Sequence, residues 1–449
     1  MMKFVILCFS LSNTLVEGST NLFDGYKKRS GLIADVPAAI LSNEVEFPLV
    51  GLGVGNLQSD RVENMIYEGL KGENRIRLFD TSQVAGVDNE IIQGIKSGTK
   101  RFKEADGIDD RVQVHLVTKI RHTYLGYERT KFAVKSILQT YSPVLKDSNI
   151  DFRIHFLIHH PRCIDSVDGM DCEKDEDELP GKVKRVGSAP HLGDGDAWKE
   201  SWRALEDLYS SDDYPAISSI GVSNFSVEEM DELLGLSRVK PHLVQMNISS
   251  LIEDTTLVDR CKMHDTHIVV FNVMEHIVMR AAGTPRAFKS VALTGDALSN
   301  GRNAANPGQI ILKWLTQNGI SIIPRTHDLD HLSENSVGAL ARLSDISSNA
   351  NIVLQKAVEA IHMGVDLDED PRVQMSFYAS DGDIFLYRYK ENLADQTYVA
   401  YVGKGNSAKI WVNPNDTFRV YNAYDPKLFK DYVLLEHDGD DRHIAVGSL

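Results

Sequence analysis

The chain has 449 residues, too many for one average domain and enough for a large domain followed by a smaller one. Hydrophobic residues make up 42% of it and charged residues 25%, a composition typical of globular proteins. The formal net charge of -16 argues against a general nucleic-acid-binding protein, because binding to phosphates needs a basic face.

The N-terminus has the pattern of a secretory signal peptide. Lys3 precedes a short apolar run, and small residues follow near Gly18. This run is too short for a membrane span, and no later stretch is long enough to cross a bilayer. We therefore expect residues 1–18 to be a signal peptide and the protein to be in the secretory pathway or extracellular. A cytoplasmic chain with an apolar start is the alternative.

From about residue 46 to residue 345, short apolar runs alternate with amphipathic segments. Eight strand–helix units can be counted, which predicts a (β/α)8 TIM barrel, because crossover helices keep consecutive strands parallel. The residues at the carboxyl ends of barrel strands line the active site. Here those residues are polar or ionisable: Asp80, Lys119, His159, Asn224, Gln245 and Arg325.

The pattern changes after about residue 368. Six short aromatic and β-branched runs are separated by Gly, Asp and Asn, which predicts a small, antiparallel, all-β domain resembling a β-sandwich over residues 368–449. Residues 364–372 are the predicted linker. These runs faintly resemble the von Hippel-Lindau β-domain, and a generic β-sandwich is the alternative.

Several motifs in the barrel region resemble the aldo-keto reductase family, barrels that reduce carbonyl compounds with NADPH. In chain order they are "PLVGLGVG", "RLFDTSQVAG" with "NE" soon after, "LVTK", "LIHHP", "SIGVSNF", "VQMN", and "IIPRT" followed by "SEN". Their order and spacing together match the family over residues 46–345. The resemblance implies a small-molecule carbonyl substrate.

The family has four catalytic residues, an Asp, a Tyr, a Lys and a His. Asp80, Lys119 and His159 match three of them. The tyrosine acts as the acid, because an adjacent lysine lowers the pKa of its phenol. Five residues after Asp80, where the tyrosine is expected, the sequence has Ala85. The resemblance therefore predicts a modified site that lacks its usual acid.

Three alternatives remain open at this site. Tyr124 or Tyr127 could bring a phenol into it, although loop tyrosines more often pack on a surface. A protonated His159 or His160 could donate the proton instead. The predicted carboxylate–lysine pair could also be only a buried ion pair that holds the barrel together.

The resemblance also assigns residues to NADPH, and no metal is expected. Ser223, Asn224 and Gln245 match the residues that bind the nicotinamide amide. Arg325 and Thr326 match the pair that binds the adenosine 2′-phosphate, and Glu334 and Asn335 match the pair that faces the adenine. Two departures predict weaker binding than usual. His331 stands where the family usually has Arg, and Val273 stands near the place of the aromatic that stacks on nicotinamide. Phe271 could replace that aromatic or could lie in the core.

Two insertions, at about residues 162–196 and 276–304, follow the fourth and seventh strands on the face where loops select the substrate. The first contains Cys163 and Cys172, which could pair in an oxidising compartment or remain two reduced thiols. Its acidic run, residues 172–182, is expected to be a solvated loop. Cys261 lies in a helical pattern and is expected to pack in the core.

Three functions agree with these features. The first is an NADPH-dependent reductase with a modified site. The second is a non-catalytic barrel that keeps NADPH as a structural or sensing ligand and binds a protein through the β-domain and the inserted loops. The third is a secreted recognition module in which the β-domain binds the partner and the barrel is a scaffold. Ala85 favours the second, and the retained residues at the strand ends favour the first.

Overall fold

The computed structural model describes the following residues before residue 372: 22–23, 26, 29–33, 36–107, 110–165, 167, 170–193, 195–274, 280, 282–298 and 305–367. Beyond residue 372 it describes seven strands. The predicted signal peptide, residues 1–18, and most of the predicted linker lie outside the described residues. The chain divides into two compact units, and each is treated by itself.

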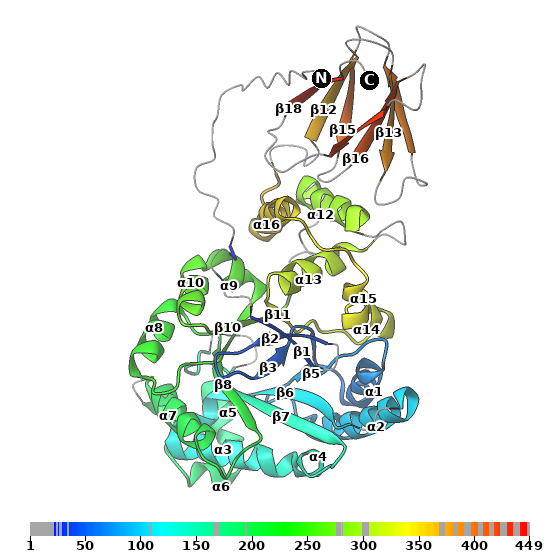
Figure 1. The fold of residues 1–449 in the computed structure, drawn as a ribbon. Helices are drawn as coiled ribbons and strands as arrows, with labels where there is room; N and C mark the ends of the chain where they lie inside the picture. The colour runs from blue at the N-terminus through cyan, green and yellow to red at the C-terminus, as the bar shows by residue number, and fades with distance from the viewer. Residues whose placement is uncertain are drawn as a thin grey trace. The chain divides into compact units, whose positions relative to one another are not determined.

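The first unit, residues 25–275 and 315–341, is built on eight parallel strands (Figure 1). They are β4 (Gly51–Gly53), β5 (Leu78–Asp80), β6 (Val112–Ile120), β7 (Ile150–Ile158), β8 (Ile217–Ser223), β9 (Leu243–Asn247), β10 (His267–Phe271) and β11 (Ser321–Ile322). Each strand pairs with the next along the chain, and a parallel bridge between Val50 and Ile322 closes the ring. The predicted (β/α)8 barrel is confirmed.

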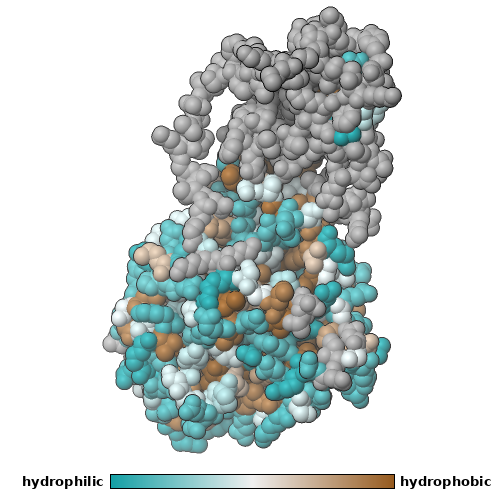
Figure 2. All heavy atoms as spheres, viewed as in Figure 1, coloured by the Kyte–Doolittle hydropathy of each residue, from teal (hydrophilic) through white to brown (hydrophobic). Residues whose placement is uncertain are grey.

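Helices connect the strands on the outside of the barrel (Figure 1). They are α1 (Ser59–Leu70), α2 (Asp88–Asp106), α3 (Tyr127–Thr140), α4 (Ser142–Leu145), α7 (Ala197–Tyr209), α8 (Val227–Leu236), α9 (Ile248–Glu253), α10 (Thr255–Met263), α14 (Leu329–Glu334) and α15 (Val337–Ala341). The residues of a further helix, α13 (Pro307–Gln317), are divided between the two units. Figure 2 shows a mostly hydrophilic face over this unit, with separate apolar patches. None of the described helices is both long and apolar enough to cross a membrane.

A three-stranded antiparallel sheet precedes the barrel and was not predicted from the sequence. It consists of β1 (Ser30–Ile33), β2 (Val36–Ile40) and β3 (Glu46–Pro48). Phe47 of β3 is fully buried and packs in one hydrophobic cluster with residues of five barrel strands, among them Leu78, Val117 and Val269. Burial of so large a ring against the barrel interior ties this sheet to the amino ends of the strands.

Phe47 also meets buried histidines at that end of the barrel. Its ring lies 4.9 Å from the ring of His155 and 5.7 Å from that of His267, measured between centroids. His155 in turn is 2.9 Å from His115 and 2.7 Å from the Ser219 hydroxyl. Burial, as the largest cause, lowers the pKa of His155 and of His267 to about 3, so both rings are neutral at pH 7.

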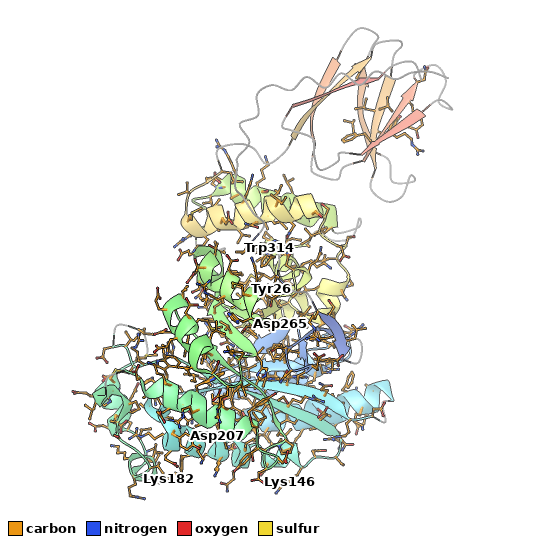
Figure 3. The ribbon with its side chains drawn as sticks, turned by 60° about the vertical axis from the view of Figure 1, so that its left-hand side comes forward. Tyr26, Lys146, Lys182, Asp207, Asp265 and Trp314 are labelled. Carbon is orange, nitrogen blue, oxygen red and sulfur yellow. A yellow bond between two sulfur atoms is a disulfide. The ribbon has the colours of Figure 1, made fainter. Side chains whose placement is uncertain are left out.

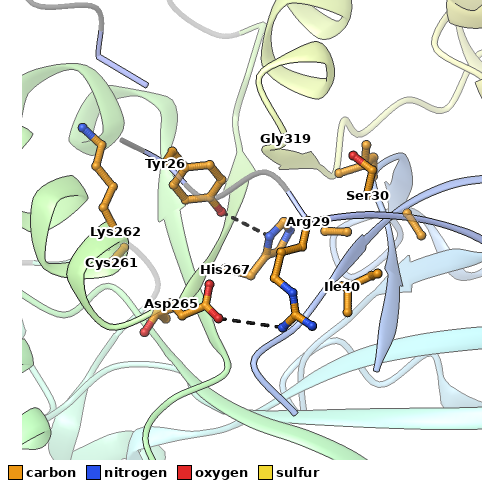
Figure 4. A pocket seen from close by; sticks show the side chains of 13 residues that line it. Tyr26, Arg29, Ser30, Ile40, Cys261, Lys262, Asp265, His267 and Gly319 are labelled. Atoms are coloured by element: carbon orange, nitrogen blue, oxygen red, sulfur yellow. Dashed lines mark hydrogen bonds and ion pairs between the residues drawn. The ribbon is translucent and has the colours of Figure 1, made fainter. Parts of the chain in front are cut away.

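A cavity of about 20 Å³ adjoins this histidine layer (Figure 4). The Tyr26 hydroxyl is 3.2 Å from His267 Nδ1 and accepts a hydrogen bond from the Ile268 amide at 3.0 Å. Arg29 and Asp265 form a longer ion pair, at 3.9 Å, on its wall. The cavity has room for about one water molecule and is too small for a substrate.

The second unit comprises residues 1–24, 276–314 and 342–449. Its described helices include α12 (Pro285–Leu298) and α16 (Ser348–Met363), and the Trp314 indole packs edge-on against Phe23 at 5.1 Å. Its strands are β12 (Val373–Ala379), β13 (Ile384–Tyr389), β14 (Thr397–Val402), β15 (Ser407–Val412), β16 (Thr417–Asn422), β17 (Phe429–Val433) and β18 (Asp441–Val446).

These seven strands form two sheets, in the orders β15-β12-β18 and β14-β13-β16-β17. The predicted small β-domain is therefore present. Its predicted antiparallel character needs one correction, because β12 pairs with β18 in parallel. The last strand was missed because "DRHIAV" is polar in its first half and lacks the aromatic signature of the others. The resemblance to the von Hippel-Lindau domain stays a prediction.

Candidate active site

Lys119 and Asp80 form a buried ion pair at the carboxyl ends of two neighbouring strands. Asp80 is the last residue of β5, and Lys119 is the residue before the end of β6. Lys119 Nζ lies 2.7 Å from Asp80 Oδ1 and 2.8 Å from Oδ2, and it also donates to the Thr81 carbonyl at 2.9 Å. Gln245 on β9 donates to Asp80 Oδ1 at 2.8 Å. Because an ammonium has three hydrogens, all of them are engaged here.

His159 and His160 follow β7 directly. Their ring centroids are 4.7 Å apart. Burial, then the Lys119 charge and the neighbouring histidine, hold the pKa of His159 well below its ordinary range. Burial, followed by His122 and Lys119, lowers the pKa of His160 to about 4. Both imidazoles are therefore neutral at pH 7, which argues against the hypothesis that a protonated histidine replaces the missing phenol.

Asn224, one of the predicted nicotinamide residues, contacts both histidines. It follows β8 with a φ of 57°, a left-handed conformation that Asn tolerates better than most residues. Its Nδ2 lies 3.0 Å from the His159 carbonyl, 3.2 Å from His160 Nε2 and 3.2 Å from Ser223 Oγ. The side-chain oxygens of Asn224 and Gln245 have no donor among the residues that the structure describes. They are available to accept from an amide NH₂ group.

The predicted phosphate pair, Arg325 and Thr326, lies beyond β11. Arg325 is exposed, and its Nη1 is 2.8 Å from the side chain of Asn56 once that amide is oriented as an acceptor. The Thr326 hydroxyl is bound to the backbone of Asp328, accepting from its N–H at 3.0 Å and donating to its carbonyl at 3.3 Å. Asp328 caps α14 through hydrogen bonds from the amides of Asp330 and His331. Backbone amides of the helix start lower the pKa of Asp328.

A hollow lies between the start of α1 and the segment that leads into α14, and its lining includes Asp60, Arg61, His327, Asp328 and Asp330. The predicted adenine pair, Glu334 and Asn335, closes α14, and both side chains are half-buried.

Ala85 lies in a tight turn that follows the end of β5. Its amide donates to the Ser82 carbonyl at 3.0 Å, and Gly86 follows with a φ of 64°. Of the two tyrosines that could replace the phenol, Tyr127 donates to Asp207 Oδ2 at 2.7 Å and so joins the outer helices α3 and α7 (Asp207 is labelled in Figure 3). Tyr124 is half-buried, and burial raises the pKa of its phenol, which makes it a poorer acid.

Comparison with known proteins now decides the family. The model described as the Aldo/keto reductase family matches residues 58–352. The chain belongs to the aldo/keto reductase family.

Two curated relatives of this reductase-family chain come from yeasts. An NADH-dependent D-xylose reductase of Candida parapsilosis is 27% identical over 313 residues, 67% of this chain and 86% of that protein. An NADPH-dependent aldose reductase of Saccharomyces cerevisiae is 27% identical over 308 residues, 66% of this chain and 86% of that protein. Among solved structures, the Bombyx mori aldo-keto reductase in complex with NADP has a TM-score of 0.52 at 19% identity, over 74% of this chain and 93% of that chain. That structural likeness shows the fold alone.

The described residues of this aldo/keto reductase fit a nicotinamide better than they fit a 2′-phosphate. At the strand ends, the side-chain oxygens of Asn224 and Gln245 have no donor among the described residues, and Ser223 and Gln245 are paired residues of β8 and β9. At the phosphate pair, the Thr326 hydroxyl is already used by the backbone of Asp328, and Arg325 Nη1 already donates to Asn56 once that amide is oriented as an acceptor. Val273 is 1% exposed and Phe271 packs against the barrel-core cluster. The core alternative for Phe271 thus gains support.

The described part of the first insertion is helical in three places and is closed by a disulfide. Cys163 and Cys172 form a disulfide with a Cα–Cα distance of 5.8 Å, which settles the alternative left open by the sequence. The insertion contains α5 (Cys172–Asp177), α6 (Gly181–Lys184) and a 3₁₀ turn, η2 (Pro190–Leu192). Cys261 is fully buried, as predicted, and burial raises its pKa to about 12. Its thiol is inert at neutral pH.

The prediction that the acidic run is a solvated loop is wrong for two of its residues. Asp175 is 7% exposed and lies 2.5 Å from Arg121 Nη2. Glu176 receives two hydrogen bonds, at 2.8 and 2.9 Å, from the buried guanidinium of Arg129. The prediction failed because it considered only the charges along this segment. It could not include the arginines that α3 and the end of β6 bring close to it in the folded chain.

Sequence reasoning missed Arg121, His122 and Asp175 as site residues. His122 begins the turn η1 (His122–Tyr124), and Arg121 directly precedes it. Both residues lie just after the end of β6, and this position was the sequence signal that could have identified them. Asp175 gave no such signal. Burial by itself would raise the pKa of Asp175. The hydrogen bonds from the Asp171 amide and from Arg121 outweigh that effect and lower the pKa, so these partners keep the buried carboxylate ionised.

Proposed function

We propose that this protein is an NADPH-dependent carbonyl reductase with a modified site that reduces aldehydes or ketones. The observation that carries this proposal is the buried Lys119–Asp80 pair, joined by Gln245 and adjacent to His159, at the carboxyl ends of four barrel strands. The names of the curated relatives, a D-xylose reductase and an aldose reductase, support the same substrate class. NADPH, when bound, supplies the hydride.

The chain's own residues would hold and orient the reactants. The Ser223 hydroxyl can donate to the carboxamide oxygen of the nicotinamide, and the side-chain oxygens of Asn224 and Gln245 can accept from its NH₂ group. Neutral His159 can donate an N–H to the substrate carbonyl and so fix its orientation. Arg325 would contact the adenosine 2′-phosphate, with Glu334 and Asn335 near the adenine.

Proton donation is the step for which the site has no positioned acid. No phenol stands at Ala85, the imidazoles are neutral, and each hydrogen of the Lys119 ammonium is engaged. Loss of a positioned general acid typically costs about 10²- to 10⁴-fold in rate. We therefore propose slow turnover in which solvent protonates the alkoxide.

The same observation favours a second function, a non-catalytic NADPH-binding barrel. In that case the Lys119–Asp80 pair stabilises the barrel, and the β-domain of residues 368–449 binds a protein partner. Binding without turnover would identify this second function.

The experiment compares the full-length protein with Ala85→Tyr. NADPH affinity is measured by quenching of tryptophan fluorescence, and NADPH oxidation by absorbance with a panel of reactive aldehydes. Turnover by both proteins, faster for Ala85→Tyr, supports the reductase. Binding by both with turnover only by Ala85→Tyr supports the non-catalytic barrel. If neither protein binds NADPH, both proposals are wrong.

We also propose that the protein enters the secretory pathway. The disulfide supports this, because structural disulfides persist mainly in oxidising compartments. Expression in a eukaryotic cell, followed by mass spectrometry of the N-terminus, tests it. A secreted chain beginning near residue 19 is the expected result, and an intact Met1 in the cytosol would contradict it.

A further inference from the structure

The insertion after β7 reaches back to the candidate active site through one carboxylate. The oxygens of Asp175 lie 2.5 Å from Arg121 Nη2 and 3.0 Å from His122 Nε2. Both partners belong to the turn that follows Lys119. Among the described residues, Asp175 is the acceptor of the Arg121 guanidinium, whose Nε is buried without a partner there. The charge of Arg121 is therefore balanced by the insertion and by no residue of the barrel strands that the structure describes.

Two anchors keep Asp175 in this place. Cys172, which the disulfide ties to Cys163, begins α5 and stands three residues before Asp175, so both are on one face of the helix, and both are buried. Glu176, the next residue, is held by the fully buried guanidinium of Arg129. An ion pair at this depth is expensive to break from one side, because the remaining charge has no partner.

Arg121 and His122 are close enough to the reacting groups to influence them. Both lower the pKa of His159, after burial, Lys119 and His160. His159 and His160 directly precede the segment that the disulfide closes. The insertion, the turn after β6 and the histidine pair thus make one side of the site. A guanidinium on this side would attract a carboxylate if it were not already paired.

We propose that Asp175 determines which substrates this site selects. Asp175 holds Arg121 in place and neutralises its charge, so the site favours uncharged carbonyl compounds over carboxylate-bearing ones. This inference rests on the proposed reductase function. It also makes the selection sensitive to a dithiol reductant. Such a reductant passes two electrons and two protons to the Cys163–Cys172 disulfide, giving two thiols and becoming a disulfide itself. The freed α5 then holds Asp175 less firmly.

The first test needs no activity. Hydrogen–deuterium exchange is followed on the full chain in the Asp175→Asn variant, with Asp177→Asn as matched control. Asp177 is on the same helix and its side chain is 87% exposed. The Tyr124 and Leu125 amides, which bond to the Arg121 and His122 carbonyls, should exchange on the order of tenfold faster in Asp175→Asn only. Unchanged protection of this turn in Asp175→Asn would overturn the positioning role.

The second test measures selection. The kcat/KM for succinic semialdehyde is divided by that for butanal, in the wild type or, if it is inactive, in the Ala85→Tyr background. Asp175→Asn should raise this ratio about tenfold, because a charge-assisted hydrogen bond to Arg121 becomes available to the substrate. Asp177→Asn should leave it unchanged. An equal ratio in Asp175→Asn and the wild type would overturn the specificity role.

The third test addresses the disulfide. The double variant Cys163→Ser/Cys172→Ser, and the wild type treated with dithiothreitol, should both shift the ratio in the direction of Asp175→Asn. Cys261→Ser should behave as the wild type, because that thiol is buried. A ratio indifferent to reduction would contradict the redox dependence. Absence of NADPH oxidation in every variant would contradict the proposed function, while the exchange experiment would still decide the role of Asp175.

Discussion

Lys119 donates to both carboxylate oxygens of Asp80, at 2.7 and 2.8 Å, and its third hydrogen reaches the Thr81 carbonyl. The side chain of Lys119 is 6% exposed and that of Asp80 13% exposed, so water screens the pair poorly. The pair therefore has a structural role whether or not the site is catalytic.

The first prediction concerns the stability of this pair. Lys119→Met should lower the free energy of unfolding by about 3–5 kcal/mol, because it leaves Asp80 buried and unpaired. The double variant Asp80→Asn/Lys119→Met should lose less than Lys119→Met alone. Urea unfolding followed by circular dichroism measures both. Arg203→Ala, which breaks an exposed pair with Glu200, is the control and should change stability by at most about 1 kcal/mol.

The second prediction concerns pH. The pKa of His155 and of His267 is lowered to about 3 in the folded protein, against an ordinary value near 6.5. Below pH 6.5 these two histidines bind protons in the unfolded chain but stay neutral in the folded protein. The free energy of unfolding therefore falls as the pH decreases from 6.5 toward 3, and these groups do not change it above pH 6.5. The loss is about 1.4 kcal/mol per pH unit for each such histidine.

Urea unfolding between pH 7.5 and 5 checks this dependence. His155→Gln should flatten it, whereas His327→Gln, at an exposed position, should not. An equal pH dependence of the free energy of unfolding in the wild type and in His155→Gln would show that the buried His155 does not cause it.

The third prediction concerns the phosphate site. His331 is exposed, and its amide donates to the carboxylate of Asp328, whose negative charge would repel an anion bound nearby. His331→Arg should tighten NADPH binding about fivefold, because a guanidinium can pair with the 2′-phosphate. NADH, which lacks that phosphate, serves as the control ligand and should bind both proteins equally. A parallel gain for NADH would show that the arginine acts elsewhere.

The fourth prediction concerns His160 as a positioning residue for Asn224. Its Nε2 lies 3.2 Å from Asn224 Nδ2 and, in the neutral ring, accepts a hydrogen bond. His160→Leu removes this acceptor and should weaken NADPH binding several-fold, whereas His160→Gln keeps an acceptor and should preserve most of the affinity. Fluorescence titration measures both. Equal losses in the two variants would indicate a packing role only.

Much of the barrel could be predicted from the sequence, because each of its strand–helix units is encoded locally. Apolar runs end on polar residues, and the barrel topology then brings the ends of consecutive strands to one rim. Asp80, Lys119 and Gln245 meet for this reason, although they are far apart in the chain. The N-terminal sheet could not be predicted in the same way, because Phe47 packs against His155 and His267, which belong to strands far along the chain.

The sequence by itself determined the family, the order of the strands and the absence of a tyrosine at Ala85, because these depend on residue identity and spacing along the chain. Only the tertiary structure decided that Asp175 is buried against Arg121, that the imidazole of His159 is neutral, and that Tyr127 faces Asp207 outside the barrel. Each of these depends on what surrounds a polar group in space, and the free energy of a charge is set by those surroundings and by burial.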